Sequence, residues 1–464
     1  MVTGMGSDWS GKQVLVIGAA RQGIADGRYL ASHGARVIIN DQRSAGQLAE
    51  AQAALADLPV TWACGGHPLE LLDGTDLVCP SGGVPLSLPL IQEAMRRGIP
   101  LSNDSQLFLE ACPCRTIGIT GSAGKTTTTS LVGRMVAQVL GEAHTWVGGN
   151  IGSPLLTVVE QMLPGDIAVI ELSSFQLEIM TRSVQIAAVL NITPNHLDRH
   201  GTMEAYRAAK GRIITHQQPG DSAVLGRDDP GAWGLAGEAP GKLVSFGWQR
   251  PPQGEMGAYL EDDQVCIWDG QSTSPVVPRR SIRLRGDHNV QNVLAACAIG
   301  FAAGLPVEAM RGAVETFTAV PHRLEWVRDW HGAAWYNDSI ATAPERAMAA
   351  IRSFSEPIVL LAGGRDKNLP WDEFARLVHQ RVDHLVVFGE AANLVEKAVG
   401  QAAQASRPFT VTRCASLQDA VQAAAEVAQA GDVVLLSPGG TSFDEFRDFE
   451  ARGEAYRKWV LELP

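Results

Sequence analysis

The feature that most constrains the fold is the glycine-rich stretch Gly118-Ile-Thr-Gly-Ser-Ala-Gly-Lys-Thr-Thr-Thr-Thr129. It follows an apolar run that begins at Arg115 and precedes residues 130–136, which have helical spacing. The backbone N–H groups of such a loop, placed between a strand and a helix, cradle phosphate groups. The sequence therefore predicts a nucleotide-binding α/β domain.

Two side chains of this loop have predicted roles of their own. Lys125 is placed to bridge the β- and γ-phosphates of ATP, and the Thr126 hydroxyl is placed to ligate Mg²⁺. The residues expected to contact ATP here are Gly121, Ser122, Ala123, Gly124, Lys125, Thr126 and Thr127.

Short apolar runs alternate with helical patterns along the whole chain, which is typical of α/β domains with mostly parallel sheets. With 464 residues the chain is too long for one core, and roughly 150 residues per domain indicates three domains. We expect a Rossmann-like domain over residues 1–112, a central P-loop domain with a parallel sheet over 113–320, and a second Rossmann-like domain over 321–464.

Composition and charge exclude several classes of protein. The 38 basic and 50 acidic residues give a net charge of −12, the wrong sign for a protein that binds nucleic acid. No run reaches the ~18 apolar residues of a membrane span, and Met1–Gly6 lacks the layout of a secretory signal. We expect a cytoplasmic protein whose seven cysteines, including Cys112 and Cys114, are buried or incidental thiols.

The first predicted strand–helix turn, Gly18-Ala-Ala-Arg-Gln-Gly23, keeps the outer glycines of a dinucleotide-binding turn but has Ala20 in the middle. A nicotinamide-dependent oxidoreductase would use this turn together with Asp41, so that function stays open on these residues alone. Asp41, Gln42 and Arg43 offer another interpretation, because a carboxylate beside a guanidinium could bind the edge of a uracil base.

Polar residues follow two further predicted strands. Glu171 ends the apolar run from Asp166, and a carboxylate at that strand end is placed to ligate magnesium beside a phosphate loop. Residues 191–201 follow the next strand and contain two histidines, an aspartate and an arginine, which favours a site at the same edge. Lys210 lies in a predicted helix over 206–214, and by composition alone it is an ordinary solvated lysine.

Together these stretches resemble the Mur ligase family, ATP-dependent amide-bond formers of peptidoglycan precursor synthesis. The family's loop has the form Gly-x-Thr-Gly-Thr-Asn-Gly-Lys-Thr-Thr, from which only Ser122 and Ala123 depart. The other matching stretches, in chain order, are 148–152, 171–178, 195–199, 206–210, 287–292, 321–323, 337–342, 363–367 and 436–444.

The resemblance is closest to the member that joins D-glutamate to UDP-N-acetylmuramoyl-L-alanine. It implies two steps: the alanyl carboxylate attacks the γ-phosphate of ATP to give an acyl phosphate, and the glutamate amine then displaces phosphate. The implied cofactors are ATP, two magnesium ions, and carbon dioxide bound as a carbamate on Lys210. The implied partners are these small molecules, and we expect a monomer.

The resemblance also implies the site residues. Those implied for catalysis and magnesium are Lys125, Thr126, Glu171, His196 and Lys210. Those implied for ATP, beyond the loop, are Asn289, Asn292, Arg323 and Asp338. Those implied for the uridine substrate are Asp41, Gln42, Arg43, Gly83, Asn150, Ser173, Gln176 and Arg199, and those for glutamate are Thr342, Lys367, Ser442 and Phe449.

Two positions near the implied amino-acid site depart from the family, which often has Lys and Asn where this chain has Ile340 and Ala343. Because a positive charge is lost there, a relative that adds L-glutamate stays open. An ATP-gated binding module and a ligase similar to folylpolyglutamate synthetase are further alternatives, although the uridine-type N-terminal domain argues against the latter.

Overall fold

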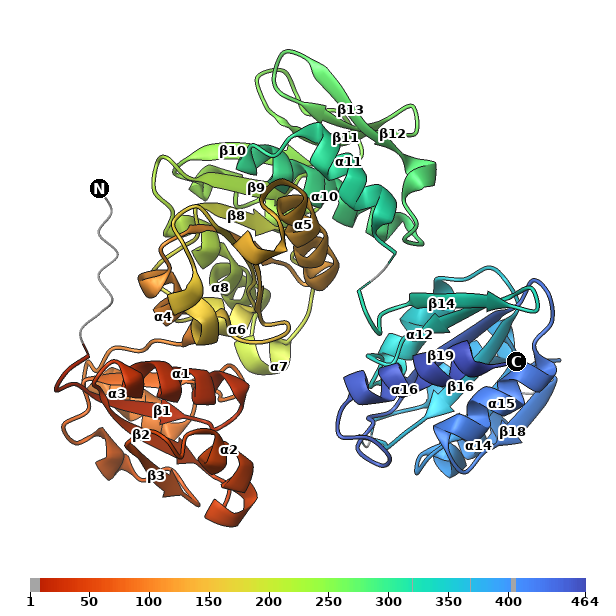
Figure 1. The fold of residues 1–464 in the computed structure, drawn as a ribbon, viewed down its shortest axis with the longest axis horizontal. Coiled ribbons are helices and arrows are strands. Elements are labelled where there is room, and N and C mark those ends of the chain that lie inside the picture. The colour runs from red at the N-terminus through yellow and green to blue at the C-terminus, as the bar shows by residue number, and fades with distance from the viewer. Residues whose placement is uncertain (1–8, 319, 368, 402–405) are drawn as a thin grey trace. The chain divides into compact units, whose positions relative to one another are not determined.

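The computed structural model describes residues 9–318, 320–367, 369–401 and 406–464. Residues 1–8, on which the expected lack of a secretory signal depends, lie outside the described part. The chain divides into two compact units, residues 1–282 with 287–317, and residues 283–286 with 318–464. Both units are built from parallel-rich sheets and helices, so the predicted α/β class is confirmed (Figure 1).

The first unit begins with a four-stranded parallel sheet in the order β3-β2-β1-β4. The strands are β1 (Gln13–Ile17), β2 (Arg36–Asp41), β3 (Val60–Cys64) and β4 (Leu77–Pro80). The helices are α1 (Arg21–Ser32), α2 (Ala49–Ala54), α3 (Pro89–Arg96) and α4 (Asp104–Ala111). β1, α1 and β2 form a βαβ unit, which contains the predicted strand–helix turn at 18–23. β3 and β4 were not indicated by the sequence, because both are short and β4 ends in a proline.

A nine-stranded sheet in the order β13-β12-β11-β10-β9-β8-β5-β7-β6 forms the rest of the first unit. Its strands are β5 (Arg115–Thr120), β6 (Thr145–Gly149), β7 (Ile167–Glu171), β8 (Ile186–Val189), β9 (Ser222–Gly226), β10 (Lys242–Phe246), β11 (Gly257–Glu261), β12 (Gln264–Trp268) and β13 (Thr273–Pro278). Its helices are α5 (Lys125–Leu140), α6 (Ser174–Leu177), α7 (Leu197–His200), α8 (Met203–Thr215), α9 (Pro230–Trp233), α10 (Asp287–Ala303) and α11 (Val307–Thr316). The pairs β11–β12 and β12–β13 are antiparallel and lie at one side of this sheet.

The phosphate loop follows β5, an interior strand of this sheet. β5 pairs in parallel with both β7 and β8, with Ile119 opposite Glu171 and Thr120 opposite Val189. The carboxyl ends of parallel strands meet at one edge of a sheet, so the loop, Glu171 and the chain after Val189 emerge together.

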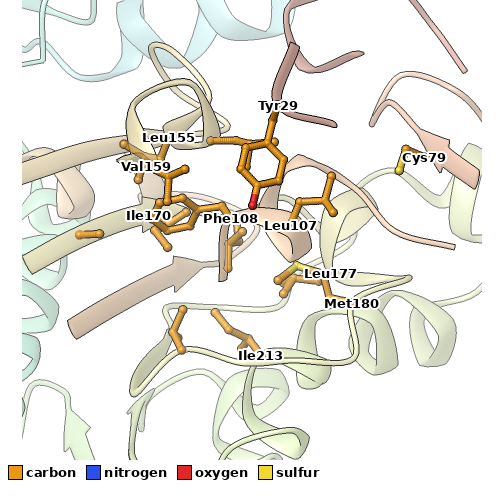
Figure 2. Packing of buried hydrophobic residues seen from close by; sticks show 14 of the residues in the cluster. Tyr29, Cys79, Leu107, Phe108, Leu155, Val159, Ile170, Leu177, Met180 and Ile213 are labelled. Atoms are coloured by element: carbon orange, nitrogen blue, oxygen red, sulfur yellow. The ribbon is translucent and has the colours of Figure 1, made fainter. Parts of the chain in front are cut away.

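One hydrophobic core joins the first helices to the nine-stranded sheet. Tyr29 of α1 and Phe108 of α4 belong to the same buried cluster as Leu155, Ile170 and Ile213 (Figure 2). Because this apolar surface is continuous, it holds the four-stranded sheet and its helices against the nine-stranded part.

The second unit has a six-stranded sheet in the order β14-β15-β19-β16-β17-β18, parallel except for the β14–β15 pair. Its strands are β14 (Glu325–Trp330), β15 (Ala333–Asn337), β16 (Ile358–Gly363), β17 (Val382–Phe388), β18 (Thr410–Arg413) and β19 (Val433–Gly439). Its helices are α12 (Pro344–Arg352), α13 (Asp372–Arg381), α14 (Ala392–Gln401), α15 (Leu417–Val427) and α16 (Phe449–Glu462). Across the described residues of both units, no helix combines the length and the apolar character that a membrane crossing requires.

The turn between β1 and α1 leaves no room for a side chain at its second glycine. A Cβ atom on Gly23 would overlap the carbonyl oxygen of Gly18, which itself has a left-handed φ of +96°. The Ser81 hydroxyl also donates to that oxygen at 3.1 Å, so the carbonyl is held from a second side.

We predict that Gly23→Ala lowers the free energy of unfolding of the first unit by about 1–3 kcal/mol, because backbone atoms must move to admit the methyl group. Hydrogen exchange of the β1 amides, together with urea unfolding, measures this change. Gly46→Ala is the matched control, since nothing lies within 4 Å of a Cβ there, and we expect its effect to stay within about 0.5 kcal/mol. Equal stability of the Gly23 and Gly46 variants would contradict the tight turn.

Candidate functional site

The phosphate loop is held in place by Asn191, which lies two residues after the end of β8. Asn191 accepts hydrogen bonds from the N–H groups of Ser122 at 2.9 Å and Ala123 at 2.8 Å. The Ser122 hydroxyl lies 3.0 Å from the Tyr206 hydroxyl of α8. Gly124 then has a left-handed φ of +82° and Lys125 begins α5, so the predicted strand, loop and helix are all present.

Glu171 and Thr126 meet at the same edge, as the register predicts. The Thr126 hydroxyl donates to Glu171 Oε2 at 2.8 Å, and the Asn150 side-chain amide donates to Oε1 at 2.8 Å. Glu171 is buried. A buried carboxylate beside a hydroxyl offers the oxygen donors that a hard divalent cation prefers.

Two lysines converge on one backbone oxygen. Lys125 Nζ and Lys210 Nζ each donate to the carbonyl oxygen of Gly121 at 2.9 Å. Lys210 is only 1% exposed, so the composition-based expectation of a solvated lysine is wrong. Burial first, and then the charge of Lys125, hold the pKa of Lys210 well below its ordinary value. Both effects act against the protonated form of this amine.

His196 and Arg199 flank one aromatic ring. The His196 ring centroid lies 5.1 Å from that of Phe175, and Arg199 Cζ lies 4.5 Å from the same ring. The Arg199 guanidinium donates to the carbonyl oxygens of Gly83 at 3.3 Å and Val84 at 3.2 Å. Two residues predicted for the uridine substrate, Gly83 and Arg199, are thus adjacent, and Arg199 borders one small cleft with Phe175 and Val84.

Ser173 and Gln176 form a capping box at the start of α6, in which each side chain bonds the other's backbone N–H. The buried Gln176 amide also donates to the Ser105 hydroxyl at 2.9 Å and to Asp104 Oδ1 at 3.4 Å. These two predicted substrate residues therefore tie the β7–α6 turn to α4.

Asp41 and Arg43 bond each other in this structure. Arg43 Nη2 donates to Asp41 Oδ2 at 2.8 Å, and the Ala19 N–H donates to the same oxygen at 2.9 Å. The Arg43 hydrogen bond holds the pKa of Asp41 well below its usual range. Asp41 thereby fixes the first turn, while Gln42 is exposed beside it.

Two of the residues predicted for ATP, Asn289 and Asn292, lie in the first turns of α10. Asn292 donates to the Asn289 side-chain oxygen at 3.0 Å. A Cβ atom on Gly124 would overlap the Asn292 side-chain oxygen, so α10 packs directly on the phosphate loop. Of the four ATP residues predicted beyond the loop, these two lie in the first unit.

The other two, Arg323 and Asp338, lie in the second unit. The buried Asp338 accepts from the Ser437 hydroxyl at 2.8 Å and from the Leu324 N–H at 3.2 Å. Burial raises the pKa of Asp338 to about 7, while Arg323 and Arg346 act to lower it.

The predicted glutamate residues also lie in the second unit. Lys367 Nζ donates to the Thr342 hydroxyl at 3.4 Å. Ser442 is buried after β19, and Phe449 is the first residue of α16. Burial, and then the charge of Arg346, lower the pKa of Lys367, so two cationic side chains share this region.

Sequence reasoning missed three residues of these sites, Asn191, Tyr206 and Arg346. Asn191 stood at a predicted strand end, and Tyr206 precedes Lys210 by four residues on one helix face, so a positional signal existed for both. Arg346 gave no comparable signal.

No group of three or more His, Cys, Asp or Glu side chains in the described part of the chain is placed to hold a metal ion. The oxygens of Thr126 and Glu171, 2.8 Å apart, nonetheless fit magnesium by their chemistry. The lowered pKa of the buried Lys210 also fits reaction with carbon dioxide, which requires an unprotonated amine.

Three consecutive family profiles match this chain. Residues 12–103 match the Mur ligase MurD-like N-terminal domain, 119–300 the Mur ligase middle domain, and 322–440 the Mur ligase glutamate ligase domain.

Two relatives that match over nearly their full length carry the same name. The UDP-N-acetylmuramoylalanine–D-glutamate ligase of Symbiobacterium thermophilum is 43% identical over 97% of this chain and 98% of that protein. The enzyme of the same name from Anaeromyxobacter dehalogenans is 40% identical over 97% and 98%.

Solved structures share the fold. The UDP-N-acetylmuramate-alanine ligase MurC of Thermotoga maritima has a TM-score of 0.56 at 18% identity, covering 97% of this chain and 99% of that one. MurF of Acinetobacter baumannii has a TM-score of 0.55 at 18% identity, covering 98% and 92%. With three profiles of one family in order and relatives of at least 40% identity over nearly all of its length, the chain belongs to the Mur ligase family.

Proposed function

We propose that this protein joins D-glutamate to UDP-N-acetylmuramoyl-L-alanine at the expense of ATP, through an acyl phosphate. The observation that carries the proposal is the phosphate loop on which Lys125 and the buried Lys210 converge beside Glu171. The near-full-length likeness to ligases of that name supports the choice of substrates. The oxidoreductase alternative loses its support, because residues 12–103 match a Mur-type domain.

In the first unit, the proposed task is to hold polyanions. Lys125 and the N-terminus of α5 face developing negative charge on the phosphates, where fixed cations and N–H groups stabilise a transition state best. Asn292 packs against the loop at Gly124.

Arg199 and Gly83 are proposed to contact the uridine substrate. Asp41, Gln42 and Arg43 are proposed to bind the edge of its uracil base. The protein is proposed to act as a cytoplasmic monomer.

Thr126, Glu171, His196 and carbamylated Lys210 would hold magnesium. When bound, magnesium neutralises phosphate charge as it builds. Conversion of Lys210 to a carbamate replaces an amine by an anionic oxygen donor, and the neutral state favoured by burial is the reactive form.

In the second unit, Lys367, Thr342 and Arg346 are proposed to bind the carboxylates of glutamate. The family often has a lysine where this chain has Ile340, and Arg346 is proposed to supply that positive charge. The charge of Arg346 lowers the pKa of Lys367, so it acts at this site. Charge-assisted hydrogen bonds of this type give both affinity and orientation.

We predict that phosphate release requires ATP, the uridine nucleotide and D-glutamate together, because the acyl phosphate cannot form without the alanyl carboxylate. L-glutamate in place of D-glutamate is the matched control and should give only background release. Turnover with ATP alone at the full rate would exclude the ligase function, and faster turnover with L-glutamate would reassign the amino acid.

We predict that Lys210→Ala lowers kcat by roughly 100-fold or more while the fold is kept. Because the missing group is an oxygen anion, formate or acetate should restore part of the rate and methylammonium should not. Incubation with ¹³C-bicarbonate should give a carbamate signal by NMR in the unsubstituted protein and none in the variant. Rescue by the amine, or the same signal in both proteins, would refute the carbamate.

We predict that Lys367→Ala raises KM for glutamate by roughly 30-fold or more, equivalent to about 2 kcal/mol, and leaves KM for ATP nearly unchanged. Arg346→Ala should act in the same direction. Lys397→Ala removes an exposed lysine of α14 in the same unit and serves as the control. A parallel rise of every KM in the Lys367 variant would show misfolding in place of lost glutamate binding.

A further inference from the structure

Two cysteines face each other where the chain passes from α4 into β5. Cys112 Sγ and Cys114 Sγ lie 3.4 Å apart, on either side of Pro113. Cys112 is half-buried and Cys114 is buried. The composition indicated cysteines that are buried or incidental. Here the half-buried Cys112 lies in contact with the buried Cys114, so the two thiols form a pair.

Both sulfurs border a cavity of about 470 Å³. Thr116, near the start of β5, Gln185, just before β8, and Asp221, just before β9, line the same cavity. It therefore opens at the amino ends of these strands, at the opposite edge of the sheet from the phosphate loop. The ligase site leaves it without an assigned role.

The two thiols differ in acidity. A hydrogen bond from Cys114 lowers the pKa of Cys112, whereas the same bond and burial raise that of Cys114. Cys112 consequently ionises first, and the thiolate is the form that attacks disulfides. Cys114 keeps its proton and stabilises the Cys112 thiolate by donation.

A cation lies at the border of the cavity. The Arg182 side chain is exposed there and forms no hydrogen bond or ion pair with the described residues. Asp221 also lines the cavity, but its carboxylate accepts the Gln218 N–H at 2.7 Å, which satisfies part of its charge. Arg182 is thus available to pair with the carboxylate of an incoming molecule.

We propose that Cys112 and Cys114 form a thiol–disulfide exchange site for low-molecular-weight disulfides that carry carboxylates. The Cys112 thiolate attacks one sulfur of the disulfide, forming a mixed disulfide and releasing one thiolate. Cys114 then loses its proton and attacks Cys112 Sγ, which expels the second thiolate and closes the Cys112–Cys114 bond. Two protein thiols are oxidised and one small disulfide is reduced to two thiols, so protons and electrons balance.

Oxidised glutathione is the probe, used on the full chain with mass spectrometry of peptides. The unsubstituted protein should lose two hydrogens on the peptide that carries both cysteines. Cys114→Ser should trap one glutathione on Cys112, because the resolving thiol is absent. Cys112→Ser should slow the reaction by roughly tenfold or more.

Cys64→Ser removes another half-buried thiol and is the matched control, with an unchanged rate expected. Arg182→Gln should slow exchange with oxidised glutathione by about two- to fivefold and leave exchange with the uncharged bis(2-hydroxyethyl) disulfide unaltered. Phosphate release by each reduced variant reports on folding, so this proposal and the ligase proposal fail separately.

Glutathione found on Cys64 or Cys414 in preference to Cys112 in the Cys114→Ser protein would overturn the exchange site. An unchanged rate in Cys112→Ser would overturn it as well. Equal slowing of the charged and the uncharged disulfide by Arg182→Gln would overturn the carboxylate preference.

Discussion

The candidate ligase site depends on the parallel pairing of β5 with both β7 and β8. This pairing brings three chain segments to one sheet edge: the phosphate loop, Glu171 at the end of β7, and Asn191 just beyond β8. Asn191 secures the loop from one side, and Glu171 receives the Thr126 hydroxyl from the other. Any other strand order would separate these groups, although each would still stand at the end of its own strand.

Electrostatics at this edge follow from burial. Two ammonium groups on one carbonyl oxygen would repel each other strongly in a region of low dielectric. Burial of Lys210 between Tyr206 and the loop, and then the charge of Lys125, lower the pKa of Lys210, which acts to reduce this repulsion. Lys125 stays at the start of α5, where the helix N-terminus adds partial positive charge. The result is a site suited to anions, with a reactive amine beside it.

The nine-stranded sheet has different chemistry at its two edges. Its carboxyl edge carries the loop, lysines and carboxylate that suit phosphates. Its amino edge carries the cavity with Cys112, Cys114 and Arg182. β5 connects the two edges, and α4, which leads into it, is tied to the β7–α6 turn through Asn103 and Gln176.

Local patterns made much of this protein predictable. The alternation of apolar runs, the glycine spacing of residues 118–129 and the order of the family stretches depend only on residue type and short-range spacing. They were sufficient for the α/β class, the ATP loop and the family. Short strands such as β4 were not predicted, because four residues that end in proline show no clear alternation of apolar and polar side chains.

Contacts between distant segments could not be predicted in this way. Composition describes Lys210 as solvated, and nothing near it in the chain shows that the Gly121 carbonyl oxygen will accept a hydrogen bond from it. By itself the sequence determined the class of fold, the phosphate loop and the family, because those follow from local spacing. Only the tertiary structure decided the burial of Lys210, the contacts of Asn191 and the exposure of each cysteine, because burial and proximity arise from strand order and packing.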